Sequence, residues 1–272
     1  MKEKLLELLK LGGNLHSRED FFKNLKVYYA KEVTSTNNWA KQLAAEDESR
    51  EMLVVTDFQS SGKGRRGRTW VAPKGKDIFM SLLLRPEIKP AQASMLTLVM
   101  GFSVVQALNE VLEIKSQIKW PNDIVYNGKK LCGILTEMKG QADSVEYVII
   151  GTGINCNTQE FKDKAVENAI SLAVICGEEV DRTLIIAAVI NAFEVNYEKF
   201  LASNDLTALI NDYNNVLVNK DREVRVYKVN DSWAGVARGI NKCGELLVED
   251  SEGNIQRIFS GEVSVRGIDG YV

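Results

Sequence analysis

The chain has 272 residues, of which 26% are charged and 45% hydrophobic, as in an ordinary soluble globular protein long enough for two domains. Its net charge of −3 argues against bulk nucleic-acid binding, and four scattered cysteines without a CxxC pair argue against a zinc ribbon or a disulfide framework. The single histidine, His16, excludes a His-rich metal site and, unless its segment folds back, a Ser–His triad.

The first half of the chain predicts helices that alternate with buried strands. Residues 2–11 form an amphipathic helix that Gly12-Gly13 ends, and Thr34–Asn38 is a run of helix-capping residues. The other elements expected here, in chain order, are a strand at Lys26–Val33, a helix at Trp39–Ala45, strands at Met52–Phe58 and Ile78–Leu84, and a helix over 91–112 after Pro90.

The most apolar stretch, Met95–Val105, is too short to span a bilayer and is predicted to be a helix buried all round. The N-terminus also lacks the apolar core of a signal peptide. We therefore expect a cytoplasmic protein with reduced thiols and no membrane partner.

In the second half of the chain, the pattern of predicted elements changes near residue 219. Before that point, Asn127-Gly128 is a strong two-residue hairpin turn. After it, short alternating strands separated by turn residues predict a small all-β barrel or sandwich. The elements expected are strands around 117–120 and 124–126, at Lys129–Glu137 and at Val145–Ile150, helices at Arg182–Leu201 and Leu206–Asn214, and strands at Glu223–Tyr227, Trp233–Ile240, Leu246–Glu249, Ile255–Phe259 and Glu262–Arg266.

A glycine- and cation-rich segment, Gln59–Trp70, lies between two of the predicted strands. It holds three glycines, four cations and one tryptophan, with no acidic residue. Glycines let backbone amides approach a ligand closely, and unneutralised arginines suit a phosphate or a carboxylate. The segment therefore indicates a cradle for a small anion, and a plain solvated basic loop is the alternative.

Three standard nucleotide-binding motifs do not fit this segment. A P-loop needs a glycine where Asp57 stands and a hydroxyl where Gly64 stands. A dinucleotide fingerprint can be aligned to Gly62–Gly67, but no helix opens after it. Kinase signatures are absent.

Five motifs taken together resemble biotin–protein ligases. Gly62–Trp70 is similar to the adenylate-binding loop of that family, and the match runs over about Val27–Arg266 in the family's order and spacing. The other motifs are Ser35-Thr36-Asn37, Lys119-Trp120-Pro121-Asn122-Asp123, Lys130-Leu131-Cys132-Gly133-Ile134-Leu135 and Gly151-Thr152-Gly153-Ile154-Asn155, with Ser260–Arg266 similar to the family's final strand.

The resemblance implies a fold and an activity. The fold is α/β (α+β): a catalytic domain with a mixed sheet and helices, as in class II aminoacyl-tRNA synthetases, followed by a C-terminal SH3-like barrel. The implied domains are a short helical segment at 1–26, a catalytic domain at 27–218 and the barrel at 219–272. The activity joins biotin to ATP to form biotinyl-5′-AMP, with Mg²⁺, and then transfers biotin to one lysine of a biotin carboxyl-carrier domain.

The resemblance also assigns roles to residues. Lys130 should bridge the biotin carboxylate and the α-phosphate, with Arg65 as a second catalytic cation, and Asp123 should hold the metal. The implied biotin-binding residues are Ser35, Thr36, Asn37, Gln59, Gly62, Lys63, Gly64, Arg65, Lys130, Gly133 and Leu135. The implied nucleotide-binding residues are Arg66, Arg68, Trp70, Lys119, Asn122, Asn155 and Arg266.

Several of these residues have a purely structural alternative. Ser35 and Thr36 could be only helix caps, and Trp70 could anchor the core. Lys130 could be an exposed hairpin lysine. Asp123 and Asn155 could serve only to form or cap turns.

Two departures from the family pattern affect the expectations. Lys63 stands where many members carry arginine, so it offers a point charge without bidentate reach. About 26 residues precede the catalytic domain, too few for the winged helix-turn-helix of bifunctional members, so sequence-specific DNA binding is not expected. A homodimer stays open, because an exposed sheet edge can pair with a second copy. The rival functions are a lipoate–protein ligase and a transcriptional regulator that senses biotinyl-adenylate.

Overall fold

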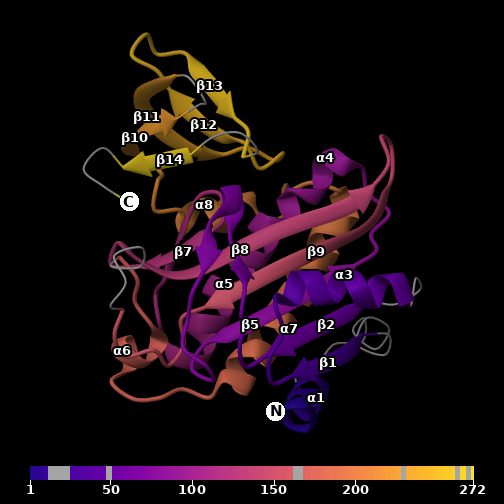
Figure 1. Cartoon of the computed structure of the whole chain (residues 1–272). Helices are drawn as coiled ribbons and strands as arrows, with labels where there is room; N and C mark the ends of the chain where they lie inside the picture. Colours follow the sequence, from indigo (N-terminus) through magenta and orange to yellow (C-terminus); the bar gives the residue numbers. More distant parts are fainter. Residues whose placement is uncertain (12–24, 47–50, 162–167, 228–230, 261–263, 268–270) are drawn as a thin grey trace.

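The structure is a computed structural model that describes the chain except residues 12–24, 47–50, 162–167, 228–230, 261–263 and 268–270 (Figure 1). Its described residues form a seven-stranded mixed sheet, a five-stranded antiparallel sheet and a two-stranded ribbon. The predicted mixed α/β fold with a C-terminal β-unit is therefore confirmed. In Figure 1 the smaller sheet lies at one end of the larger layered unit.

The large sheet has the order β1-β2-β5-β9-β8-β7-β6, and only β1 and β2 run parallel. Its strands are rich in aliphatic residues because both faces are covered, and all seven residues of Ile78–Leu84 are buried. The strands are β1 Lys26–Ala30, β2 Met52–Thr56, β5 Ile78–Leu84, β6 Gln117–Lys119, β7 Asp123–Tyr126, β8 Lys129–Gly140 and β9 Val145–Ile154.

Helices cover the two faces of this sheet (Figure 1). On one face, Ala40 and Ala44 of α3 pack with Met52 and Val54. Leu53 and Val55 alternate with these residues along β2, so they belong to the larger core on the other face. That core includes the apolar faces of two long helices. The helices are α1 Lys2–Leu11, α3 Thr36–Glu46, α4 Pro90–Ala93, α5 Met95–Leu112, α6 Leu172–Cys176, α7 Arg182–Ser203 and α8 Ile210–Asn215.

The apolar helix expected over 91–112 is divided into α4 and α5. By length and composition, Pro90–Leu112 is long and apolar enough to cross a membrane, but 67% of its most apolar window is buried inside the protein. It packs between the sheet and α7, and the expectation of a buried helix is confirmed.

The structure also corrects several element boundaries. Helix α3 begins at Thr36 and not at Trp39, because Ser35 already accepts the first helical hydrogen bond from the Trp39 amide at 3.0 Å. Helix α6 was not predicted, since five residues are too few for a periodic pattern. The predicted helix at 206–214 begins with turns and becomes α-helical only at Ile210. Gly12-Gly13, His16 and residues 262–263 of the last predicted strand lie outside the described residues.

The Asn127-Gly128 turn between β7 and β8 is confirmed. Both residues have positive φ, 47° and 76°, as a type I′ turn requires. The turn places Tyr126 opposite Lys129, and a bulge between Ile124 and Val125 then shifts the register by one residue, so that Asp123 lies opposite Gly133.

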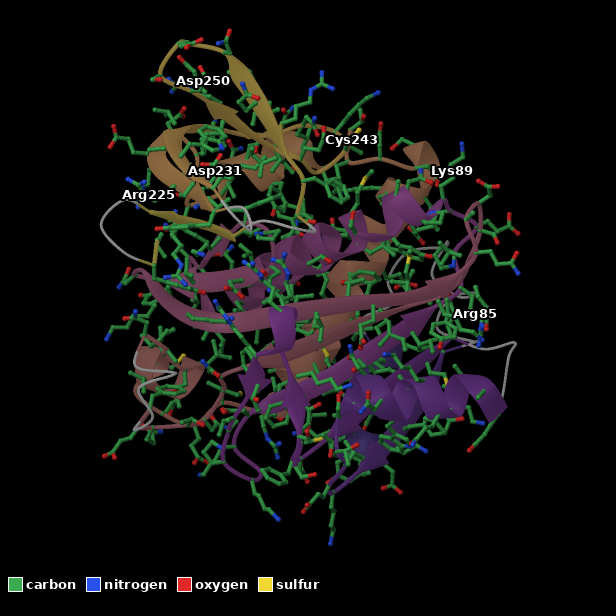
Figure 2. All side chains as sticks on the ribbon, turned by 45° about the horizontal axis from the view of Figure 1, so that its top comes forward. Arg85, Lys89, Arg225, Asp231, Cys243 and Asp250 are labelled. Carbon is green, nitrogen blue, oxygen red and sulfur yellow. The ribbon has the colours of Figure 1, made fainter. Side chains whose placement is uncertain are left out.

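The smaller sheet has the order β13-β12-β11-β10-β14 and packs against the large unit through the turn at Gly244. The Trp120 indole donates to the Gly244 carbonyl at 3.1 Å, and a Leu98 methyl lies near the Gly244 backbone. Figure 2 shows Cys243 on the side facing the helices, with the Asp250 turn at the outer end. The strands are β10 Arg222–Tyr227, β11 Ser232–Ile240, β12 Leu246–Glu249, β13 Ile255–Ile258 and β14 Ser264–Gly267.

Replacing Gly101 by alanine tests the packing of α5. A Cβ at this position would lie 3.6 Å from Ile134 Cδ1 and 3.7 Å from Ile124 Cδ1, which is ordinary van der Waals contact. Alanine is favoured over glycine inside a helix, so we expect Gly101→Ala to raise the free energy of unfolding by about 0.5–1 kcal/mol. Urea unfolding followed by circular dichroism measures it, and a destabilised variant would show that α5 packs more tightly than described.

Candidate active site

A cavity of about 710 Å³ opens between one end of the large sheet and the small sheet. It lies within the size range of small-molecule sites. Every site residue expected from the sequence lines it except Gly62, so segments 35–37, 59–70, 119–123, 130–135 and 151–155 do meet in space. Of the residues that the structure describes, seven cations and one carboxylate, Asp123, line it; the cations are Lys63, Arg65, Arg66, Arg68, Lys119, Lys130 and Arg266.

The glycine-rich segment forms a small hairpin. Strands β3 (Gly62–Lys63) and β4 (Thr69–Trp70) pair, and a 3₁₀ turn at Arg65–Gly67 joins them. Arg66 has a positive φ of 59°, a strained value for a residue with a side chain. Gly62 lies behind the cavity wall, since a Cβ there would be 2.5 Å from the Trp70 carbonyl oxygen.

The Trp70 ring lies on a bare patch of the large sheet. Gly133 and Gly153 face each other on β8 and β9, and a Cβ on either would lie 2.6 Å or 2.9 Å from the indole. The two glycines are therefore needed because the ring takes the space of their side chains. One face of the Trp70 ring is therefore packed against the sheet. The indole Nε1 is buried without a hydrogen-bond partner among the described residues, so this donor is available to a ligand.

The inner end of the cavity is neutral and polar. The backbone N–H and the hydroxyl of Thr36 both donate to Gln59 Oε1, at 2.8 Å and 3.0 Å. The Ser81 hydroxyl lies within hydrogen-bond distance of Thr36 Oγ1, at 2.8 Å, and of Asn37 Oδ1, at 2.6 Å. These bonds hold the Gln59 amide with its nitrogen directed away from Thr36, where a ligand carbonyl could accept.

Asn37 lines the cavity, but its amide is already used. Its Nδ2 donates to Glu137 Oε2 at 2.8 Å and to the Leu135 carbonyl at 3.3 Å. Burial alone would raise the pKa of Glu137, but hydrogen bonds from Lys41 and Asn37 and the charge of Lys41 outweigh it and lower the pKa. Asn37 therefore supports the pocket wall in this arrangement, and Ser81 is the polar contact that the sequence motifs did not reveal.

Lys130 is held by Asp123. Its Nζ lies 2.7 Å from Asp123 Oδ1 and 5.4 Å from the centre of the Trp70 ring. The other oxygen, Oδ2, accepts from the Tyr271 hydroxyl at 2.5 Å. Burial would raise the pKa of Asp123, but the charges of Lys130 and Lys119 and the hydrogen bonds of Lys130 and Tyr271 hold it below its usual range. Asp123 is thus ionised and neutralises the two lysines in part.

Lys119 is the most deeply buried cation of the cavity, with 6% of its surface exposed. Its Nζ donates to the Val265 carbonyl at 3.2 Å and lies 4.3 Å from the centre of the Tyr271 ring. Burial lowers the pKa of Lys119 to about 8, against the raising effect of Asp123 and in the same direction as the charges of Lys130, Arg266 and Arg68.

Arg65 connects the hairpin to both sheets. Its Nη1 donates to Asn122 Oδ1 at 2.8 Å, and its Nη2 donates to the carbonyl of Ser260, which precedes the last strand of the small sheet. Burial lowers the pKa of Arg65, while the charge of Asp123 opposes this. Arg65 is therefore held at the junction by groups from two segments, 119–123 and the residues before β14.

The side-chain amide of Asn155 bonds to the protein backbone, which is the structural role considered as the alternative to nucleotide binding. Its Nδ2 donates to the carbonyls of Lys130 and Ile170, each at 3.2 Å, so it ties the start of β8 to the segment before α6. Lys63 likewise donates to Asn38 Oδ1 at 2.8 Å, at the rim of the cavity.

Sequence reasoning missed the contribution of the small sheet to the cavity. Tyr227, Val265 and Tyr271 line it together with Arg266, and only Arg266 was expected. No motif marks Tyr271, because it lies 148 positions from its partner Asp123.

Fold and cavity together define an α/β protein with a site for an elongated ligand that is neutral and polar at one end and anionic at the other. Family models match at two places: the "Biotin/lipoate A/B protein ligase family" over residues 29–155 and the "Biotin protein ligase C terminal domain" over residues 221–266. The chain belongs to the biotin protein ligase family, as the relatives also show.

The "Bifunctional ligase/repressor BirA" of Bacillus subtilis is 36% identical over 97% of this chain and 83% of its own length. The "Biotin--[acetyl-CoA-carboxylase] ligase" of Mycobacterium tuberculosis is 27% identical over 78% of each chain. Among solved structures, the biotin protein ligase of Aquifex aeolicus in complex with biotin and ATP matches with a TM-score of 0.77 and 31% identity, covering 89% of this chain and 99% of that one.

Replacing Gly133 by alanine tests the packing of the Trp70 ring on the sheet. The new Cβ would lie 2.6 Å from Trp70 Cζ3 and 3.2 Å from Lys130 Nζ, so the ring must lift from the sheet. We expect the near-ultraviolet circular dichroism of the ring to weaken. Gly101→Ala is the matched control, since its Cβ has room. An unchanged spectrum in Gly133→Ala would contradict the described contact.

The pKa of Lys119 predicts a pH dependence of anion binding. Because the folded pKa is about 8, the ammonium is charged below pH 8 and loses its charge as the pH rises through that value. The affinity for inorganic pyrophosphate should therefore fall above pH 8, by up to about tenfold per pH unit. Calorimetric titration from pH 7 to pH 9.5 measures it.

Lys119→Arg is the control for this titration, because arginine stays charged over the whole range. The variant should lose less affinity than the wild type above pH 8, which corrects for the ionisation of pyrophosphate itself. Parallel pH profiles for the two proteins would show that Lys119 does not face the anion.

Proposed function

We propose that the chain is an ATP-dependent ligase that forms biotinyl-5′-AMP from biotin and ATP and then transfers biotin to a lysine of a biotin carboxyl-carrier domain. The observation that carries the proposal is the cavity itself, in which a neutral polar end leads to a cation-rich end beneath Trp70, in a chain of this family. The substrates and the acceptor are inferred from the family and from this chemistry.

The first step needs charge stabilisation and no enzyme nucleophile. A carboxylate oxygen of biotin attacks the α-phosphorus of ATP, a new P–O bond forms, and pyrophosphate leaves with the electron pair of the broken bond. Both reactants are anions, so repulsion and developing charge are the obstacle, and preorganised cations relieve it. Lys130 and Arg65 meet this need, since Asp123 and Asn122 hold them at the cavity wall.

Biotin should lie along the inner half of the cavity. Its ureido carbonyl and N–H groups suit the Ser35, Thr36 and Gln59 cluster, and its apolar rings suit the strip of β8 at Gly133 and Leu135. Trp70 then separates this half from the nucleotide and offers a face for adenine stacking. The nucleotide half is formed by Arg66, Arg68, Lys119, Asn122 and Arg266, with Asn155 as a support of its wall.

The second step transfers biotin to an amine. The lysine nitrogen of the acceptor attacks the biotinyl carbonyl carbon of the mixed anhydride, a C–N bond forms, AMP leaves, and the amine loses a proton. Positioning of the two reactants in the enclosed cavity supplies most of the rate, because the anhydride is already activated.

A magnesium ion fits the residues present only in part. Asp123 is the one carboxylate that lines the cavity, and the described residues hold no cluster of three side chains of the metal-binding kinds. Mg²⁺ is commonly held by one carboxylate, substrate phosphates and water. Both Asp123 oxygens are already paired, with Lys130 and Tyr271, so the arrangement described does not offer this carboxylate to an ion. Mg²⁺ would be held by the phosphates of ATP and by water, and it would neutralise phosphate charge.

We keep the other sequence expectations as proposals. The division at residues 1–26, 27–218 and 219–272 agrees with a second sheet that begins at Arg222. A cytoplasmic protein agrees with the four free cysteines. Homodimer formation through a sheet edge and the expected lack of sequence-specific DNA binding stay predictions, which sedimentation and gel-shift measurements test.

A carrier-domain assay tests the function and separates it from lipoate ligation. Purified protein is incubated with ATP, a biotin carboxyl-carrier domain and either biotin or lipoate, and the carrier is weighed by mass spectrometry. We expect the mass of one biotinyl group on one lysine, dependent on ATP, and none with lipoate. Lipoate-dependent and biotin-independent modification would establish the rival function.

Lys130→Ala tests the catalytic assignment. The variant should lower the rate of biotin-dependent pyrophosphate exchange by at least about a hundredfold, because a charge-assisted contact to the reacting groups is lost. Biotin binding should stay detectable by calorimetry. Lys129→Ala, at the exposed neighbouring position of the same hairpin, is the matched control. Exchange at the wild-type rate in Lys130→Ala would assign the chemistry to another cation.

A further inference from the structure

Tyr271, near the end of the sequence, lies at the catalytic cavity. The Tyr271 hydroxyl donates to Asp123 Oδ2 at 2.5 Å, and Lys119 Nζ lies 4.3 Å from the centre of its ring. The side chain thus contacts two residues of the large unit, one of which, Asp123, is 148 positions away in the chain. Tyr271 lines the cavity beside them.

Asp123 passes this contact on to Lys130. Its Oδ1 pairs with Lys130 Nζ at 2.7 Å, while Tyr271 occupies Oδ2. Asp123 is 9% exposed, and a buried carboxylate with one oxygen unpaired would turn toward water or another donor. The tyrosine hydroxyl therefore fixes the plane of the carboxylate and, with it, the place that Oδ1 offers to the lysine.

A lysine in this position needs such an anchor. Its side chain has a flexible four-carbon stem, and 30% of the Lys130 side chain is exposed, so packing alone does not hold the ammonium. A catalytic charge displaced by about 1 Å can lose on the order of a hundredfold in rate. The hydrogen bond from Tyr271 orients the carboxylate of Asp123, and this carboxylate in turn holds the ammonium of Lys130.

We propose that Tyr271 is a positioning residue for the adenylation step, acting through Asp123 to hold the Lys130 ammonium at the reacting groups. The inference rests on the proposed function, since it assigns Lys130 to that step. It makes Tyr271 part of the site and goes beyond the five motifs. Tyr271 itself need not touch biotin or ATP.

Tyr271→Phe removes only the hydroxyl and keeps the ring beside Lys119. Biotin-dependent exchange of labelled pyrophosphate into ATP is measured at varied biotin and ATP concentrations. A positioning residue acts on the chemical step, so we expect kcat to fall by about tenfold, as for loss of a hydrogen bond to a charged group, with both KM values within about twofold of the wild type.

Two further variants show that the effect runs through Asp123. In an Asp123→Ala background, Tyr271→Phe should cause no further loss, because the hydroxyl then has no group to orient. Tyr213→Phe is the matched control, since the Tyr213 hydroxyl is buried without a hydrogen-bond partner in the described part of the chain. It should keep the wild-type kcat. Thermal melts confirm that each protein is folded.

Three results would overturn the inference. Unchanged kcat in Tyr271→Phe removes the positioning role, and a raised KM for ATP with unchanged kcat makes Tyr271 a nucleotide contact. An equal loss with and without Asp123 makes its effect independent of that carboxylate. Each of these leaves the proposed function intact, whereas wild-type protein without biotin-dependent exchange would overturn the function and the inference together.

Discussion

One buried carboxylate holds the site together. Among the described residues that line the cavity, Asp123 is the one acid beside seven cations, and it meets Lys130 on one oxygen and Tyr271 on the other. Without it, two lysines would repel each other in a partly desolvated place, at a cost that rises as the dielectric falls. Lys130 of the β7–β8 hairpin and Tyr271 converge on this group, so the position of the Lys130 ammonium depends on one ion-paired side chain.

Missing side chains, and not charge, shape another part of the cavity wall. There, two paired glycines leave a bare patch of sheet on which Trp70 lies, and the absence of side chains creates the space. A slot formed by backbone is rigid because the sheet hydrogen bonds hold it, and it suits flat, apolar rings. The cations around Asp123 and the neutral polar cluster of Thr36 and Gln59 give the cavity its two distinct ends, and Trp70 on the two glycines forms part of its wall.

The small sheet completes the site from outside the large one. Its residues before and within β14 accept hydrogen bonds from Arg65 and Lys119, and Trp120 donates to the turn at Gly244. The acceptors of these bonds are backbone carbonyls, which every residue has. A sequence motif therefore cannot predict them. The two sheets act as one unit at the cavity, because cations of the large unit are satisfied by the small one.

The sequence by itself determined the strands, the long helices, the hairpin turn at Asn127-Gly128 and the set of segments that form the cavity, because these follow from periodicity, from glycine's conformational range and from motifs read together. It did not determine which of those residues face a ligand. The amides of Asn37 and Asn155 bond to other groups of the protein, while Ser81 supports Asn37 from behind the cavity wall and Tyr271 enters the cavity from an unmarked position. Only the tertiary structure decided this, because a hydrogen-bond partner is chosen by distance in space, and distance along the chain carries no information about it.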